Sequence, residues 1–238
     1  MFNIVKYNLY RACKSKTIYV LVAVCVLLGG VVTAISQKFD GGVLDFSLVI
    51  IAFTVPALIY NDYKDGLARN KIMSGCGRNG VYAANLISSC IIGAGFWLLF
   101  QATSIGVMNA MSKTPMYTGT HALMYLGIGL LAVVALCSLF TAIAVNMRSH
   151  FSLIVCIAIF AALMMFGSSF MNLTAKPSFS PQAREVIGVI YRLIPTGQLV
   201  LLENPLIENA WALPLLSAVF IAATSVIGGA LFAKKDLK

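Results

Sequence analysis

Charged side chains are scarce in this sequence of 238 residues. Only 11% of the residues are Asp, Glu, Lys or Arg, whereas a soluble domain usually carries about 25%. Hydrophobic residues make up 60% of the chain, and the mean hydropathy is +0.90. A soluble globule of this length could not bury so much apolar surface, but a protein surrounded by lipid need not bury it. The shortage of charge therefore excludes an ordinary soluble domain.

The motifs of several enzyme classes are also absent. The dipeptide Gly-Lys occurs nowhere, so the sequence has no phosphate-binding Gly-x-x-x-x-Gly-Lys-Ser/Thr loop. Neither His121 nor His150 begins a His-Glu-x-x-His zinc motif, and no Gly-x-Ser-x-Gly nucleophile motif is present. The six cysteines form no Cys-x-x-Cys pair, which argues against a zinc site or a disulfide framework. We expect no catalytic, cofactor or metal site in this chain.

None of the eight acidic residues lies deep in an apolar run. Ion-coupled transporters usually keep an ionisable residue inside the membrane. Its absence argues against a secondary transporter with a carboxylate relay, while coordination by backbone carbonyls stays open. The sequence also lacks a basic and aromatic cluster on a soluble face, so we expect no nucleic-acid partner.

The apolar runs predict the fold. A helix needs roughly 20 apolar residues to cross about 30 Å of hydrocarbon. Six runs meet this length, and they predict an all-α, polytopic membrane protein with residues 1–238 in a single transmembrane domain. We interpret the first run as a retained helix and not as a cleaved signal peptide. The predicted spans are residues 17–35, 43–60, 81–110, 120–145, 151–171 and 211–233.

The distribution of Lys and Arg predicts the orientation. With both termini in the cytoplasm, 12 of the 17 basic residues lie in cytoplasmic segments. Such an excess is the usual sorting signal of membrane proteins. We expect a multi-pass protein of a bacterial cell membrane. The five basic residues on the outer side are then Lys38, Lys113, Lys176, Arg184 and Arg192.

Two further segments have the pattern of amphipathic helices. At the N-terminus, Phe2, Val5, Leu9 and Ala12 recur at helical spacing, which favours an interfacial helix over a simple basic flank. The outer segment 181–202 has an apolar stripe, with Pro181 as its first helical position and Pro195 as a stop. A second apolar piece covers residues 198–202. We expect both pieces to lie in the outer leaflet as re-entrant or interfacial helices, because they are too short to cross the membrane.

Residues 59–82 form a polar island between the second and third spans. This island has six charged residues, four glycines and three asparagines. Asp62 has the type and position of an N-cap, and Asp65 follows three residues later. Gly75 has the position of a left-handed stop. The pattern predicts a short cytoplasmic helix over residues 63–74, which could bind a soluble partner.

The apolar stripe of this helix would consist of Tyr63, Leu67, Ala68 and Ile72. Two polar residues inside the third span are also candidates for function. Asn85 and Gln101 could line a substrate path or contact a second subunit, or they could form ordinary hydrogen bonds between helices.

Three strings in this order resemble those of the membrane subunit of a type-2 ATP-binding cassette exporter. The island contains Asp65, Gly66, Asn70, Gly75 and Arg78, and an Ile-Pro-Thr-Gly-Gln string at residues 194–198 precedes the last span. Phe232, Lys234, Lys235 and Asp236 follow that span. The family usually has a more acidic start to the island than the Asn61-Asp62 pair found here.

The resemblance implies a function in which the island is a coupling helix on a separate ATPase. Two ATP-binding cassette ATPase subunits would bind the ATP, and two permease subunits, identical or paralogous, would form the path through the lipid membrane. The neutral spans favour amphipathic or hydrophobic cargo such as peptides, lipids or drugs, moved outward by alternating access. The predicted coupling residues are Tyr63, Asp65, Gly66, Leu67, Arg69, Asn70, Ile72, Gly75 and Arg78.

Two other classes of function remain open from the sequence. The chain could be a non-transporting membrane anchor or sensor that holds a cytoplasmic partner through the same island. An intramembrane enzyme ranks third, because the spans contain no paired Asp residues, Ser/His dyad or metal triad.

Overall fold

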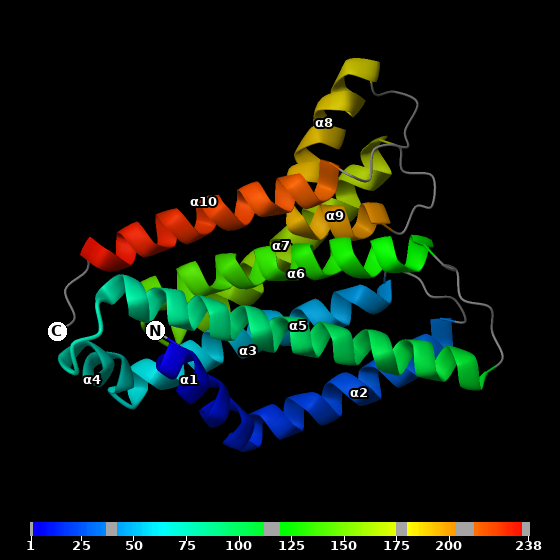
Figure 1. The fold of residues 1–238 in the computed structure, drawn as a ribbon. Coiled ribbons are helices and arrows are strands. Elements are labelled where there is room, and N and C mark those ends of the chain that lie inside the picture. Colours follow the sequence, from blue (N-terminus) through cyan, green and yellow to red (C-terminus); the bar gives the residue numbers. More distant parts are fainter. Residues whose placement is uncertain (1, 37–41, 112–119, 175–179, 203–211, 235–238) are drawn as a thin grey trace.

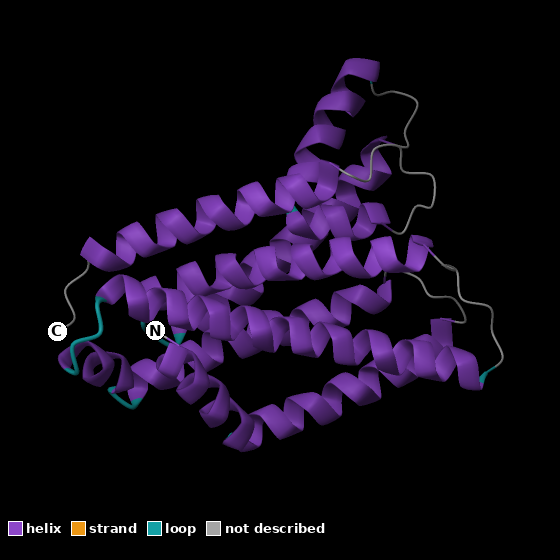
Figure 2. Ribbon diagram, viewed as in Figure 1, coloured by secondary structure: helices purple, strands orange, loops and turns teal. Residues whose placement is uncertain are grey.

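The computed structural model describes residues 2–36, 42–111, 120–174, 180–202 and 212–234. All regular structure within these ranges is helical (Figures 1 and 2), which confirms the predicted all-α class for the described residues. The helices are α1 (Phe2–Lys14), α2 (Lys16–Ser36), α3 (Gly42–Lys64), α4 (Leu67–Met73), α5 (Arg78–Ala110), α6 (Thr120–Met147), α7 (Phe151–Thr174), α8 (Pro181–Leu193), α9 (Pro195–Leu202) and α10 (Ala212–Lys234).

Four helices in the described ranges are long and apolar enough to cross a membrane. They are α2 over Lys16–Ile35, α5 over Arg78–Ala110, α6 over Tyr125–Met147, and α10 over Ala212–Lys234. These helices indicate a multi-pass membrane protein. The other two predicted spans fall within α3 and α7, which are helical. That these two helices also cross the bilayer stays a prediction.

Helix α6 forms the centre of the bundle and packs against α3, α5, α7, α9 and α10 (Figure 1). In its apolar window 67% of the residues are buried, compared with 17% for both α2 and α10. The Trp97 indole of α5 packs on Gly129 of α6, where a Cβ would lie 2.6 Å from the ring. The Ser138 and Thr224 hydroxyls share a 2.7 Å hydrogen bond between α6 and α10. The outer helices expose the apolar surface that lipid would cover.

One end of the bundle contains α1, α4 and the last turn of α10 (Figure 1). The Arg78 guanidinium, at the start of α5, donates a 2.8 Å hydrogen bond to the Ala233 carbonyl at the end of α10. From α4, the Lys71 ammonium donates to Asn8 Oδ1 of α1 at 2.7 Å. We call this the island end, because the polar island lies there together with α1 and the end of α10.

The helical prediction for the N-terminal segment is confirmed, but part of its apolar stripe faces protein. Val5 and Ala12 are 6% and 4% exposed, and α1 packs against α5. Phe2 is 80% exposed. A position of α1 at the membrane interface stays a prediction.

Helices α8 and α9 precede α10, and α8 begins at Pro181 as predicted. Pro195 ends α8, as expected, but it also begins α9 three residues before the predicted second piece. Proline suits a first helical position because its missing N–H would have no intrahelical partner. The position of these helices in the outer leaflet is not tested.

The Ile-Pro-Thr-Gly-Gln string joins α8, α9 and α10. Gln198 is fully buried, its Nε2 donates to the Arg192 carbonyl at 2.8 Å, and its Oε1 accepts a hydrogen bond from the Ser217 hydroxyl. Gly197 lies so close to the Tyr191 carbonyl that a Cβ would collide with it. The string therefore has a packing function within this chain.

Candidate interaction site in the polar island

The polar island does not form the helix that the sequence predicted. Helix α3 continues through Asp62 and ends at Lys64, and a separate helix α4 covers Leu67–Met73. Gly66 separates them with a left-handed backbone, at φ 68°. The predicted continuous helix over residues 63–74 is therefore wrong, because a left-handed turn at Gly66 interrupts it. The predicted stop at Gly75 is confirmed by its φ of 89°.

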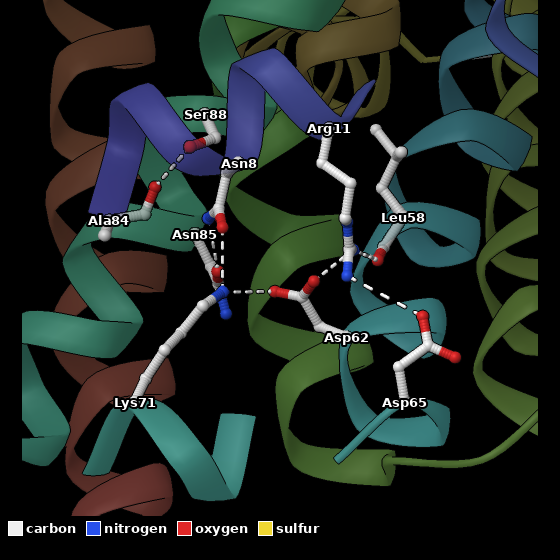
Figure 3. A network of polar contacts seen from close by, with 9 residues as sticks. All are labelled: Asn8, Arg11, Leu58, Asp62, Asp65, Lys71, Ala84, Asn85 and Ser88. Atoms are coloured by element: carbon white, nitrogen blue, oxygen red, sulfur yellow. Dashed lines mark hydrogen bonds and ion pairs between the residues drawn. The ribbon is translucent and has the colours of Figure 1, made fainter. Parts of the chain in front are cut away.

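Asp62 is not the N-cap of the island helix, which is a second correction. Its residue is only 3% exposed, and its carboxylate pairs with Arg11 from α1 and Lys71 from α4 (Figure 3). The distance between Lys71 Nζ and Asp62 Oδ2 is 2.7 Å. A buried carboxylate needs such partners, because an unpaired charge is costly to remove from water. One carboxylate thus connects α1, α3 and α4.

Two asparagines extend this network to α5. Asn8 Nδ2 donates to Asn85 Oδ1 at 2.9 Å, and Asn8 Oδ1 accepts the Lys71 bond (Figure 3). A cavity of about 20 Å³ lies among Asn8, Arg11, Asp62 and Asn85. It can hold one water molecule, which needs about 10–15 Å³ on this measure. Asn85 Nδ2 has no hydrogen-bond partner within the described residues, and a water there could accept from it.

A second cluster at the island end joins α3 to the ends of α6 and α10. The Tyr63 hydroxyl donates to the Val145 carbonyl at 3.2 Å. The Arg148 guanidinium lies over the rings of Tyr63 and Phe232, at 5.8 and 5.7 Å from their centroids. Burial raises the pKa of Tyr63 to about 12, although Arg148 opposes the shift. The hydroxyl therefore keeps the proton that it donates.

Helix α4 has one face toward the bundle and one toward the surface. Ala68 is 2% exposed, and Ile72 packs against the core. Most of the predicted apolar stripe is thus covered by the chain itself, and Leu67 is half-buried. The exposed face presents Arg69, Asn70 and Met73, of which Met73 is 67% exposed.

The two polar candidates of the third span occupy different environments. Asn85 belongs to the network at the island end, as described above. Gln101 is 2% exposed, and neither of its side-chain polar atoms has a hydrogen-bond partner among the described residues. The structure does not bring these two residues together, and a path or dimer contact at either one stays a prediction.

The other predicted coupling residues form turns or contacts within the chain. Asp65 lies 3.8 Å from Arg11 Nη1, Gly66 and Gly75 form the two left-handed turns, and Arg78 binds the end of α10. Sequence reasoning did not find Asn8, Arg11 and Arg148. A basic residue on the predicted N-terminal helix was the available signal for Arg11, but nothing local identified its partner.

These contacts connect α4, which has one exposed face, to the rest of the bundle through the buried Asp62 carboxylate and its two partly buried basic partners. The contacts run from Lys71 of α4 through Asp62 of α3 to Arg11 of α1. Such an arrangement can transmit the binding of a partner to the membrane helices.

Compared with known proteins, the chain matches no protein-family model and no curated protein.

Proposed function

We propose that the chain is the membrane permease subunit of a type-2 ATP-binding cassette exporter. It pairs with a second permease subunit, identical or paralogous, and with two ATPase subunits that bind and hydrolyse ATP. Six spans form the bilayer part, with both termini in the cytoplasm of a bacterial cell. The complex moves amphipathic or hydrophobic cargo outward by alternating access, and this chain hydrolyses nothing itself.

The observation that carries this proposal is the construction of α4. A solvated linker needs neither two left-handed glycine turns nor a lysine held by two side chains, and α4 has both: Gly66 and Gly75 flank it, and Lys71 bonds to Asp62 and Asn8. Its outer face remains available, with Met73 at 67% exposure. An exposed methionine suits a contact surface because its flexible thioether adapts to a partner.

The ion-pair network supplies the mechanism. When an ATPase moves α4, Lys71 carries Asp62 with it, because separating this buried pair costs several kcal/mol. Asp62 belongs to α3 and also pairs with Arg11 of α1. The movement of α4 is therefore passed to α1 and α3 as a unit, and α3 leads into the membrane part of the bundle.

A substitution on the outer face tests the proposal. Met73→Asp would place an unpaired carboxylate in the contact with the ATPase, which costs several kcal/mol. The matched control is Met111→Asp, because Met111 is 45% exposed at the opposite end of α5. We expect Met73→Asp to insert normally but to lose copurification with the ATPase and the response of its ATP turnover to substrate. Met111→Asp should retain both.

Two results would contradict the proposal. Full ATPase association and transport by Met73→Asp would mean that α4 is not the contact. A purified chain without a second permease subunit or ATPase, under conditions that preserve related exporters, would favour the membrane anchor or sensor instead.

A further inference from the structure

The junction between α1 and α2 contains a second pocket, which shares the lining residues Arg11 and Leu58 with the small cavity. Its volume is about 240 Å³, compared with the 10–15 Å³ that one water needs on this measure. The pocket is open to the surface and can admit a polar group of several atoms. It is lined by Arg11, Lys14, Ser15, Leu58, Asn61 and Asp65.

The basic and acidic lining residues come from different elements. Arg11, Lys14 and the Ser15 hydroxyl come from the junction of α1 and α2, whereas Asn61 and Asp65 come from the end of α3. Arg11 Nη1 is 3.8 Å from Asp65 Oδ2, too far for a hydrogen bond, and it has no hydrogen-bond partner within the described part of the chain. Figure 3 shows the Arg11 side chain between Asp62 and Asp65. The pocket thus has the basic groups Arg11 and Lys14 on one side and the exposed Asp65 carboxylate on the other.

The position of the pocket relative to α2 points to the lipid headgroups. Helix α2 begins at Lys16, next to the pocket, and most of its apolar surface is uncovered by protein. Tyr10 and Tyr19 are 57% and 65% exposed on either side of the junction. Exposed tyrosines of this kind mark the level of the headgroups in membrane proteins.

We propose that this pocket binds the phosphoethanolamine headgroup of a phospholipid in the leaflet at the island end. The guanidinium of Arg11, the ammonium of Lys14 and the Ser15 hydroxyl donate to the phosphate oxygens. The lipid ammonium donates to the Asp65 carboxylate and the Asn61 side-chain oxygen. The phosphate then lies toward the basic side of the pocket and the ammonium toward the acidic side.

The acidic side of the pocket selects this headgroup over two others. A phosphoglycerol headgroup has hydroxyls that can donate to Asp65, but it carries no cation, so its negative charge would not be offset beside the carboxylate and the charge-assisted hydrogen bond of the ammonium would be lost. A choline headgroup carries no N–H to donate to Asp65. The proposal does not depend on the export function, because it requires only that α2 is in contact with lipid.

Lipid retention by the purified full-length chain tests this site. The delipidated protein is titrated with equal amounts of phosphatidylethanolamine, phosphatidylcholine and phosphatidylglycerol of the same acyl chains, and native mass spectrometry counts the lipids that remain bound. We expect phosphatidylethanolamine to be retained preferentially. Lys14→Gln should weaken its binding about fivefold, because a basic residue near phosphate contributes about 1 kcal/mol.

Variants of Asp65 distinguish the headgroups. Asp65→Asn should abolish the preference for phosphatidylethanolamine over phosphatidylcholine, and Asp65→Glu should retain it. Lys6→Gln is the control, because Lys6 is exposed on α1 but does not line the pocket. Equal retention of all three lipids, a preference for phosphatidylglycerol, or an equal effect of Lys6→Gln and Lys14→Gln would overturn the proposal.

Discussion

Asp62 and Lys71 lie on consecutive helices of the polar island, and the Lys71 ammonium nitrogen is 2.7 Å from Asp62 Oδ2. The same carboxylate binds Arg11 of α1. The exposed fractions of the Asp62 and Lys71 side chains are 4% and 10%, so water screens this pair only weakly. The pair therefore holds α4 against α3, and removing either partner should loosen the packing of both helices.

Replacement of the shared carboxylate should destabilise the protein. Asp62→Asn leaves Arg11 and Lys71 without their common anion, and breaking a buried pair in this way costs about 3–5 kcal/mol. Asp65→Asn is the control, because its side chain is 55% exposed and such a pair contributes about 0–1 kcal/mol. In thermal unfolding in detergent, the unfolding temperature should fall clearly for Asp62→Asn and stay close to that of the unaltered chain for Asp65→Asn. Equal unfolding temperatures for both variants would contradict the structural role of Asp62.

The ends of α5 provide a test of the membrane orientation. Its 33 residues extend for about 50 Å at 1.5 Å per residue, so Cys76 and Met111 lie beyond opposite ends of a membrane-spanning helix. In a background without the other cysteines, Met111→Cys should react with an impermeant thiol reagent in intact cells. Cys76 should react only after permeabilisation. Labelling of Cys76 in intact cells would reverse the predicted orientation.

The local signals of the sequence predicted much of this fold. Apolar runs gave the long helices, Pro181 gave the start of α8, and Gly75 gave a left-handed turn. These features depend on residues close to one another in the chain. Apolar length alone also gave six runs, of which four are matched by described helices that are long and apolar enough to span.

The polar contacts of the island could not be predicted in the same way. Arg11 and Asp62 are far apart in the chain, and Asp62 near a predicted helix start has the same local pattern as an N-cap. The stripe of Tyr63, Leu67, Ala68 and Ile72 keeps helical spacing across Gly66, so the spacing did not reveal the break between α3 and α4. The sequence of an apolar stripe also does not show whether the stripe packs against its own bundle or against a partner protein. In this structure most of the stripe packs against the bundle.

Gly197 offers a test of the packing between α8 and α9. A Cβ at this position would collide with the Tyr191 carbonyl, and backbone atoms can move little. Gly197→Ala should therefore destabilise the protein by about 1–3 kcal/mol. Gly188→Ala is the control, since nothing lies within 4 Å of its Cβ, and Ala favours a helix by about 0.5–1 kcal/mol. Thermal unfolding that is the same for both variants would contradict this close approach.

Gly66 tests whether the turn between α3 and α4 depends on backbone conformation alone. A Cβ at Gly66 would meet no atom within 4 Å, so its φ of 68° is the obstacle to a larger residue. The left-handed conformation costs an L-residue about 1–2 kcal/mol, and Asn tolerates it better than Ala. Gly66→Ala should therefore weaken the packing of α4 against α3 and α5, and Gly66→Asn should weaken this packing less.

The control is Gly80→Ala, because Gly80 also has no atom within 4 Å of its Cβ but lies in the first turn of α5 without a left-handed backbone. Hydrogen exchange of the α4 amides is the measurement. Faster exchange should occur in Gly66→Ala, with Gly66→Asn between it and the unaltered chain. Gly80→Ala should leave exchange unchanged or slow it slightly, since it reduces the freedom of the unfolded chain. The same response in Gly66→Ala and Gly80→Ala would mean that the left-handed turn does not hold α4 against Asp62.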